Sequence, residues 1–263
     1  MQEITSLQNP IVKETTALHQ KKNRAESGMF LIEGFKGVED AVKSGLNIER
    51  IFLKKGKGEN LANFSQEKVY FVDEKILKKI STTDTPPEVV AVAHQKKFSI
   101  GDVFRDKNPV IIVLENIKDA GNLGTVVRTA KASNISGAIL TGDCIDIYNP
   151  KVVRSSAANL WKLPVVSFKE TANLKKELEK YGKFQILATK TSNEKSRKLY
   201  YEIDYKKPTV ILFGSEAEGL SEELASQAEE CIKIPMNEDI ESLNLSISAG
   251  IIMYEAYKQR LTE

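Results

Sequence analysis

The sequence feature that most constrains the fold is an unbroken apolar run from Val110 to Leu114. Such a run is typical of a strand buried on both faces, which occurs in parallel sheets covered by helices. Segments with helical spacing separate it from further apolar strand candidates, which lie at 137–141, 164–168, 184–189, 209–213 and 231–234. This alternation predicts an α/β fold whose sheet is mostly parallel.

The residues before this run predict a second, smaller αβ domain. Strand candidates at 29–33, 48–53, 69–72 and 89–93 alternate with helical segments, beginning with a helix that starts at Pro10 and continues towards residue 26. The alternation stops between residues 95 and 109. We therefore divide the chain into a domain of residues 1–98 and a domain of residues 99–263.

The second domain should contain several helices between its strands. We expect helices near 125–133, 151–160, 170–181, 221–228 and 244–260. In the last of these, spacings of three, four or seven residues place a set of apolar side chains near one face. The set comprises Leu243, Ile247, Ile251, Tyr254 and Leu261.

Composition excludes several classes of protein. Charged residues make up 28% and hydrophobic residues 41% of the 263 residues, as in globular domains. No apolar run approaches the roughly 20 residues of a membrane-spanning helix, and the start of the chain lacks a signal-peptide pattern, so we expect a cytoplasmic protein. The two cysteines and two histidines form no ligand-spaced cluster, which argues against a metal site, a disulfide framework or a histidine-based triad. We expect Cys144 and Cys231 to be buried free thiols.

The charge distribution permits a nucleic-acid surface on the first domain. Residues 1–98 hold 16 Lys and Arg against 13 Asp and Glu. Lys54, Lys55 and Lys57 lie with Gly56 and Gly58 in a basic loop. Each lysine alone is most simply a solvated side chain, and the set is a candidate for contact with the RNA backbone.

Three polar segments follow strands of the predicted parallel sheet, where ligands of α/β proteins bind. The first carries Asn116, Asn122 and Arg128, the second is 212–220, and the third is 232–246. None contains a dinucleotide fingerprint or a P-loop, and two acidic residues in 212–220 would repel a polyphosphate. Each segment also has a simpler explanation: a helix cap, a glycine turn or a surface ion pair.

The three segments together resemble the motifs of a known family. The motifs are Asn116-x5-Asn122-x-Gly124-x3-Arg128-Thr129-Ala130, then Phe213-Gly214-Ser215-Glu216-x2-Gly219-Leu220, then Ile234-Pro235-Met236-x5-Ser242-Leu243-Asn244-x-Ser246. In this order and spacing they are similar to those of the SpoU/TrmH family of RNA ribose 2′-O-methyltransferases, in the SPOUT class. Ser6-Leu-Gln-Asn9-Pro10-x2-Lys13 and Leu31-Ile-Glu33-Gly34 also resemble the substrate-binding domain that this family appends.

The resemblance implies a cofactor, an assembly and a fold. The cofactor would be S-adenosyl-L-methionine, the chain would be a homodimer, and its C-terminal segment would be threaded through a deep trefoil knot, an exception to the rule against knots. By match to the family motifs, Gly214, Ile234 and Leu243 would contact the cofactor, together with Thr189 at the end of a strand.

The resemblance also implies catalytic residues. Arg128 matches the family's proposed activator of the hydroxyl; because a guanidinium stays protonated, we expect it to bind an RNA phosphate and stabilise charge. Asn122 and Asn244 would fix loop and ribose geometry, and Glu216 and Ser242 would support the site.

The resemblance leaves the substrate RNA open. The first domain favours large-subunit ribosomal RNA, with transfer RNA as the second choice. The chain has Glu238 where the family usually has glycine, which bears on the substrate and keeps open a catalytically silent RNA-binding module of the same fold. A small-molecule methyltransferase is a remoter alternative, because the first domain would then lack a purpose.

Overall fold

The computed structural model describes residues 2–57, 68–189 and 198–261. By its internal contacts the chain forms two compact units. Met1–Lys97 and Asp146–Trp161 make up the first unit, and Phe98–Ile145 and Lys162–Glu263 make up the second. The first unit therefore takes in a segment that lies far along the chain.

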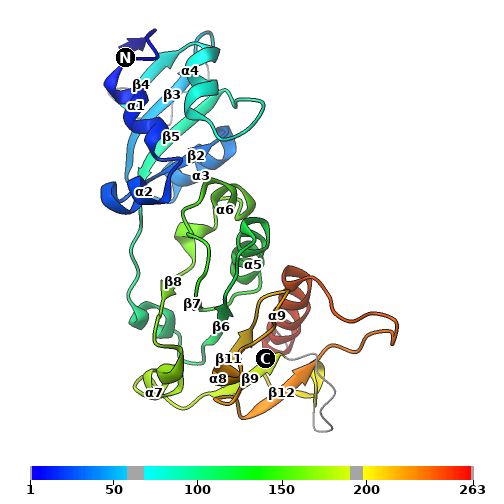
Figure 1. Ribbon diagram of the computed structural model, residues 1–263. Coiled ribbons are helices and arrows are strands. Elements are labelled where there is room, and N and C mark those ends of the chain that lie inside the picture. The colour runs from blue at the N-terminus through cyan, green and yellow to red at the C-terminus, as the bar shows by residue number, and fades with distance from the viewer. Residues whose placement is uncertain (1, 58–67, 190–197, 262–263) are drawn as a thin grey trace. The chain divides into compact units, whose positions relative to one another are not determined.

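The first unit is built on a five-stranded mixed sheet (Figure 1). Strand β5 is antiparallel to its neighbours β2 and β3, whereas β1, β4 and β3 run parallel. The strands, in sheet order, are β1 (Gln2–Ile4), β4 (Val69–Val72), β3 (Ile48–Lys54), β5 (Val89–His94) and β2 (Met29–Glu33). The predicted strands are confirmed, and β1 was not predicted.

The helices of the first unit are α1 (Pro10–Ala17), α2 (Lys21–Ser27), α3 (Phe35–Lys43) and α4 (Glu74–Ile80). The prediction of one helix from Pro10 towards residue 26 is wrong, because the chain turns between α1 and α2. Arg24, which is 2% exposed, donates from Nη1 to the carbonyl oxygens of Leu18 and His19 at 2.8 and 2.9 Å. These carbonyls are satisfied by a side chain instead of by a continuing helix.

The segment Asp146–Trp161 packs on residues 1–97 of the first unit through both polar and aromatic contacts. It contains α6 (Pro150–Ser155), which is shorter than the predicted helix 151–160, and the first two residues of a 3₁₀ turn at Leu160–Lys162. The buried Arg24 forms a 2.6 Å ion pair with Asp146. The ring of Tyr148 lies 4.7 Å from that of Phe30, and Trp161 Nε1 donates to Ser44 Oγ at 2.8 Å. Burial raises the pKa of Tyr148 to about 12.

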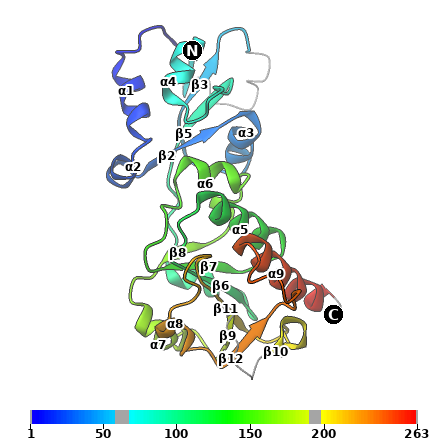
Figure 2. The same cartoon turned by 45° about the vertical axis from the view of Figure 1, so that its right-hand side comes forward.

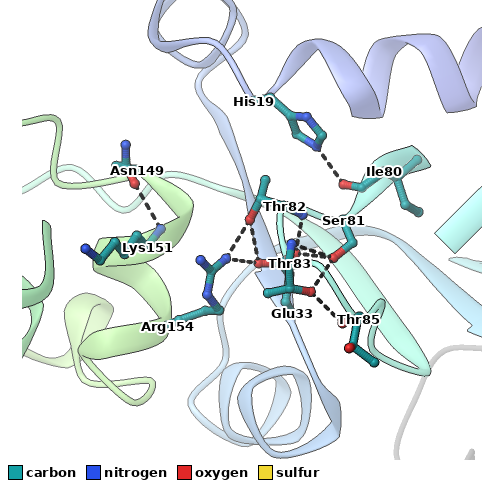
Figure 3. A network of polar contacts seen from close by, with 10 residues as sticks. All are labelled: His19, Glu33, Ile80, Ser81, Thr82, Thr83, Thr85, Asn149, Lys151 and Arg154. Atoms are coloured by element: carbon teal, nitrogen blue, oxygen red, sulfur yellow. Dashed lines mark hydrogen bonds and ion pairs between the residues drawn. The ribbon is translucent and has the colours of Figure 1, made fainter. Parts of the chain in front are cut away.

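A buried carboxylate, Glu33, also holds the segment Asp146–Trp161 on the sheet of the first unit (Figure 3). Glu33, at the end of β2, is 3% exposed on its side chain. Its carboxylate accepts hydrogen bonds from Ser81 Oγ and the Thr82 backbone N–H, both at 2.7 Å. It also forms an ion pair with Arg154 of α6. Burial favours a higher pKa for Glu33, but these donors outweigh it and hold the pKa below its ordinary value.

The second unit contains a seven-stranded sheet whose paired strands are all parallel in the described part of the chain. In sheet order the strands are β10 (Lys198–Leu199), β12 (Glu230–Lys233), β9 (Gln185–Thr189), β11 (Thr209–Phe213), β6 (Val110–Glu115), β7 (Gly137–Thr141) and β8 (Val165–Ser167). The run 110–114 thus lies in β6, a buried strand that pairs in parallel with β11 and β7, as predicted. The short strand β10 was not predicted.

Helices cover both faces of this sheet. Leu174 and Leu178 of α7 (Leu174–Glu179) and Leu224 of α8 (Glu222–Ala225) join one core cluster with Ile111 and Val113 of β6. Figures 1 and 2 show α5 (Ala120–Ala132) and α9 (Leu245–Leu261) together on the opposite side of the sheet from α7 and α8. An α/β unit with a parallel sheet is therefore confirmed.

The start of α5 differs from the sequence prediction, and the structure shows which side of α9 packs inward. Helix α5 begins at Ala120 instead of near Thr125, because the Asp119 carboxylate caps it by accepting from the Asn122 N–H at 2.7 Å. In α9, the predicted apolar face is largely exposed, with Ile247 at 54% and Tyr254 at 49%. The side that packs inward is formed instead by Leu245, Ala249, Ile252, Met253 and Ala256.

Both cysteines are free, as predicted, but they are half-buried instead of buried. Cys144 lies in the loop after β7, and Cys231 lies in β12, packed against the edge of a core cluster. Among the described residues, no helix is long and apolar enough to cross a bilayer.

Candidate functional site

The candidate site lies where four neighbouring strands of the second unit end. β12, β9, β11 and β6 are adjacent and parallel, so their carboxyl ends meet at one edge of the sheet. β9 ends at Thr189, β11 is followed by Gly214, β12 is followed by Ile234, and β6 leads into α5. All three polar segments singled out in the sequence therefore start from this edge, as expected for a ligand site in an α/β fold.

Hydrogen bonds between side chains join the three segments. Asn244, just before α9, donates from Nδ2 to Asn122 Oδ1 at 3.1 Å and to Glu216 Oε1 at 3.4 Å. Asn122, in the first turn of α5, donates from Nδ2 to the same Glu216 oxygen. The three side chains form a closed triangle, which fixes the start of α5, the loop after β11 and the approach to α9 relative to one another.

Asn244 also caps the last helix. Its Oδ1 accepts hydrogen bonds from the Ser246 N–H at 2.9 Å and from the Ser246 hydroxyl at 2.6 Å. Asn244 therefore both caps α9 and takes part in the triangle with Asn122 and Glu216. The amide nitrogen faces the other two loops while the amide oxygen holds the helix N-terminus.

The loop after β11 is a tight turn that depends on glycine. Ser215 and Gly219 form an isolated β-bridge, and the Gly219 N–H donates to the Ser215 carbonyl at 2.9 Å. A Cβ on Gly214 would lie 2.0 Å from the Gly219 carbonyl carbon and 2.2 Å from the Leu220 nitrogen. Gly214 is therefore required by close approach of backbone, and Gly219 by its φ of +69°.

The other residues proposed for the cofactor lie at the same edge. Thr189 is half-buried, and its hydroxyl donates to the Leu212 carbonyl at 2.8 Å, which links the ends of β9 and β11. Ile234 and Leu243 are half-buried and begin and end the segment between β12 and α9. Glu238 and Asp239, within that segment, are exposed.

Arg128 and Ser242 are not part of the hydrogen-bonded triangle. Arg128 lies on α5, two turns beyond Asn122, and its side chain is exposed. Among the described residues, the side chains of Arg128 and of the exposed Ser242 make no hydrogen bond or ion pair. The Arg128 guanidinium is thus available to an external anion, and a guanidinium fork suits a phosphate.

Sequence reasoning missed Glu115, the last residue of β6. Its side chain is buried, at 3% exposure, and it accepts hydrogen bonds from the backbone N–H and the hydroxyl of Ser221. The available signal was a carboxylate placed directly after an unbroken apolar run, where a buried charge needs partners. Those partners lie 106 residues along the chain, which the sequence does not indicate.

Comparison with known proteins gives the family. Residues 109–254 match the model of the SpoU rRNA methylase family, and residues 9–91 match an MRM3-like substrate binding domain. An uncharacterized tRNA/rRNA methyltransferase of Synechocystis is 35% identical over 98% of this chain and 94% of its own length.

Two further comparisons agree with this result. The 23S rRNA (guanosine(2553)-2′-O)-methyltransferase RlmP of Bacillus subtilis is 28% identical over 97% of this chain and 98% of its own length. The crystal structure of an AdoMet-bound rRNA methyltransferase from Sinorhizobium meliloti superimposes with a TM-score of 0.87 at 34% identity, covering 98% of this chain and 97% of that one. The resemblance seen in the three motifs is confirmed, and the chain belongs to the SpoU rRNA methylase family.

Proposed function

We propose that this protein transfers a methyl group from S-adenosyl-L-methionine to a ribose 2′-hydroxyl of RNA, with large-subunit ribosomal RNA as the substrate. The observation that carries the proposal is the triangle of Asn122, Glu216 and Asn244, which joins all three family motifs at one edge of the sheet. The relative from Bacillus subtilis named for 23S ribosomal RNA supports the choice of substrate.

The chain's residues fit the cofactor. The close backbone approach at Gly214 leaves no room for a side chain, so the loop presents backbone groups at the end of β11. We assign the binding of the cofactor to Gly214, Thr189, Ile234 and Leu243. When bound, S-adenosyl-L-methionine supplies an electrophilic methyl group on a positively charged sulfur, and the acidic Glu216 nearby suits that charge better than it would suit a polyphosphate.

Arg128 has the role of binding the RNA next to the reacting ribose. In the transfer the ribose oxygen forms a bond to the methyl carbon, the bond from that carbon to sulfur breaks and leaves S-adenosyl-homocysteine, and the hydroxyl proton passes to the neighbouring RNA phosphate. A permanently protonated guanidinium is a poor base, but it can hold that phosphate and stabilise the negative charge that develops on the ribose oxygen. Asn122, Glu216 and Asn244 hold the loops in register, so orientation supplies much of the acceleration. Ser242 supports the same segment.

The role of Arg128 is tested by Arg128→Ala, with Lys131→Ala as the matched control. Lys131 is an exposed cation on the same helix. We expect Arg128→Ala to abolish methylation while binding of S-adenosyl-L-methionine by calorimetry is retained, and Lys131→Ala to stay within about threefold of the parent. Methylation by Arg128→Ala at the parent's rate would exclude the assigned role.

We propose that the RNA also contacts the first domain, residues 1–98, through helix α4. Lys75, Lys78 and Lys79 are exposed on one side of α4 and form no salt bridge with any described residue. In contrast, Lys54, Lys55 and Lys57 of the basic loop pair with Glu74, Glu3 and Glu88. Gly58 of that loop lies outside the described residues. Phosphates can therefore approach the α4 lysines without displacing a carboxylate.

Two triple variants with the same change in charge test this surface. Replacement of the three α4 lysines by alanine should weaken RNA binding at least about tenfold and reduce its salt dependence, because each phosphate contact releases counterions. The triple alanine variant of the basic loop should lose less affinity, since its lysines are already neutralised. Equal losses in the two variants would mean that only total charge matters.

The alternative substrate is transfer RNA, and the alternative class is a silent RNA-binding module. Mapping of ribose methylation in total RNA from cells with and without the gene separates ribosomal from transfer RNA. A folded protein that fails to bind S-adenosyl-L-methionine in calorimetry would favour the silent module. The observed triangle of motif residues favours the enzyme.

We further propose a cytoplasmic homodimer with the deep trefoil knot of the family. Support for the dimer comes from α9, where Ile247, Tyr254 and Leu261 expose 54%, 49% and 62% of their surface in a single chain. An apolar set of this kind commonly marks an interface between proteins. Tyr254→Asp should shift the protein from dimer to monomer in light scattering, whereas an unchanged mass would place the interface elsewhere.

A further inference from the structure

The loop that contains Gly214 and Glu216 is attached at both ends to the same strand. At its start, Phe213 of β11 pairs in register with Leu114 of β6. At its end, Ser221 is bonded to Glu115, the next residue of β6. The loop of residues 214–220 is therefore closed by two consecutive positions of one strand, and only the second of these attachments uses a side chain.

The side-chain attachment is a pair of short hydrogen bonds. The Ser221 N–H donates to Glu115 Oε2 at 2.7 Å, and the Ser221 hydroxyl donates to Glu115 Oε1 at 2.7 Å. Both carboxylate oxygens of Glu115 are thus used, and the group is 3% exposed. Ser221 Oγ also accepts from the Leu224 N–H at 3.2 Å and caps α8. A carboxylate with two donors in a protected position holds its partners more firmly than neutral groups would.

From this geometry we infer that Glu115 is a positioning residue, which sets the affinity for S-adenosyl-L-methionine by holding the loop of residues 214–220 through Ser221. This inference rests on the proposed function, because it needs that loop to bind the cofactor. Glu115 is not a catalytic residue in this account. It acts through Ser221 on Gly214 and Glu216, and the triangle with Asn122 and Asn244 holds the middle of the same loop.

Three variants separate positioning from simple stability. Glu115→Ala removes both hydrogen bonds to Ser221. Glu115→Gln keeps the shape and one accepting oxygen, while its amide group can donate to the Ser221 hydroxyl. Ser221→Ala removes the hydroxyl from the other side and leaves the backbone N–H bond. The expected order of effect is therefore Glu115→Ala, then Ser221→Ala, then Glu115→Gln.

The measurement is the Kd for S-adenosyl-L-methionine by calorimetry on the full chain, together with separate KM values for the cofactor and for RNA. Loss of hydrogen bonds to a buried charged group predicts a Kd on the order of tenfold higher or more for Glu115→Ala. The KM for the cofactor should rise in parallel while the KM for RNA stays the same. The double variant Glu115→Ala/Ser221→Ala should bind the cofactor about as weakly as Glu115→Ala, because both changes remove the same contact between Glu115 and Ser221. Its Tm should be lower, since Ser221→Ala also removes the cap of α8.

The outcomes are distinguishable. A Kd within twofold of the parent in folded Ser221→Ala, measured even if Glu115→Ala fails to fold, would overturn the inference. A lowered Tm with normal affinity in the folded variants would also overturn it, since that is the result of stability alone. Failure of the parent itself to bind S-adenosyl-L-methionine would contradict the proposed function instead, whatever the variants do.

Discussion

The substitution Gly214→Ala tests whether the tight loop after β11 is the cofactor cradle. The added Cβ would lie 2.0 Å from the Gly219 carbonyl carbon and 2.1 Å from its oxygen, both backbone atoms. Ordinary contact begins at about 3.4 Å, so the two sides of the turn must separate by about 1.4 Å. A misplacement of about 1 Å can already cost about 100-fold in kcat/KM. This corresponds to about 3 kcal/mol of binding or transition-state stabilisation.

The matched control is Gly250→Ala, in the middle of α9. There the new Cβ would lie 3.7 Å from Thr129 Cγ2, which is ordinary contact, and alanine favours a helix by about 0.5–1 kcal/mol over glycine. We expect Gly250→Ala to bind S-adenosyl-L-methionine and to methylate RNA like the parent, with an equal or higher Tm. Gly214→Ala should keep its circular dichroism but lose cofactor affinity in calorimetry. Parent-like affinity in Gly214→Ala would refute the assignment of this loop.

Two further predictions concern the first unit. The pKa of Glu33 in the folded protein lies below the ordinary 4.5. The ionised carboxylate of Glu33 therefore stabilises the fold fully above pH 4.5, and this stabilisation is lost as the pH falls through the folded-state pKa. Glu33→Gln should therefore lower the free energy of unfolding by about 2 kcal/mol at pH 7. In urea titrations at about pH 3 the parent and the variant should differ less in this free energy. A difference between them that does not change with pH would exclude this linkage. Arg24→Met should lower the free energy of unfolding by about 3 kcal/mol in the same assay, because it leaves Asp146 and the carbonyls of Leu18 and His19 without their donor. A decrease of less than about 1 kcal/mol would contradict the role given to Arg24 between α1 and α2.

The strands were predictable because a strand buried on both faces leaves a local signal. The run at 110–114 and the other apolar segments of the second unit match observed strands closely, since burial selects the same residue types throughout. The short strands β1 and β10 were missed, because segments of three and two residues carry no periodicity. The start of α5 was misplaced because glycine and asparagine suggested a loop, whereas the Asp119 cap starts the helix there.

The site was predictable only in part. Asn122, Glu216 and Asn244 were selected by resemblance to a family, and their contacts join positions up to 122 residues apart that no local pattern connects. Glu115 was passed over because its role depends on β11 lying next to β6, which is a property of strand order. The exposure of the apolar face of α9 was left open for a related reason: helical spacing identifies an apolar side but does not say whether it faces the core or a partner.

The central claim is methyl transfer to a ribose hydroxyl of RNA. The most direct measurement incubates the purified protein with large-subunit ribosomal RNA, transcribed without modifications, and S-adenosyl-L-methionine carrying a labelled methyl group. Digestion to nucleosides then locates the label. We expect one labelled 2′-O-methyl nucleoside with the parent and none with Arg128→Ala. Label on a base, or no label in ribosomal or transfer RNA from a protein that binds the cofactor, would contradict it.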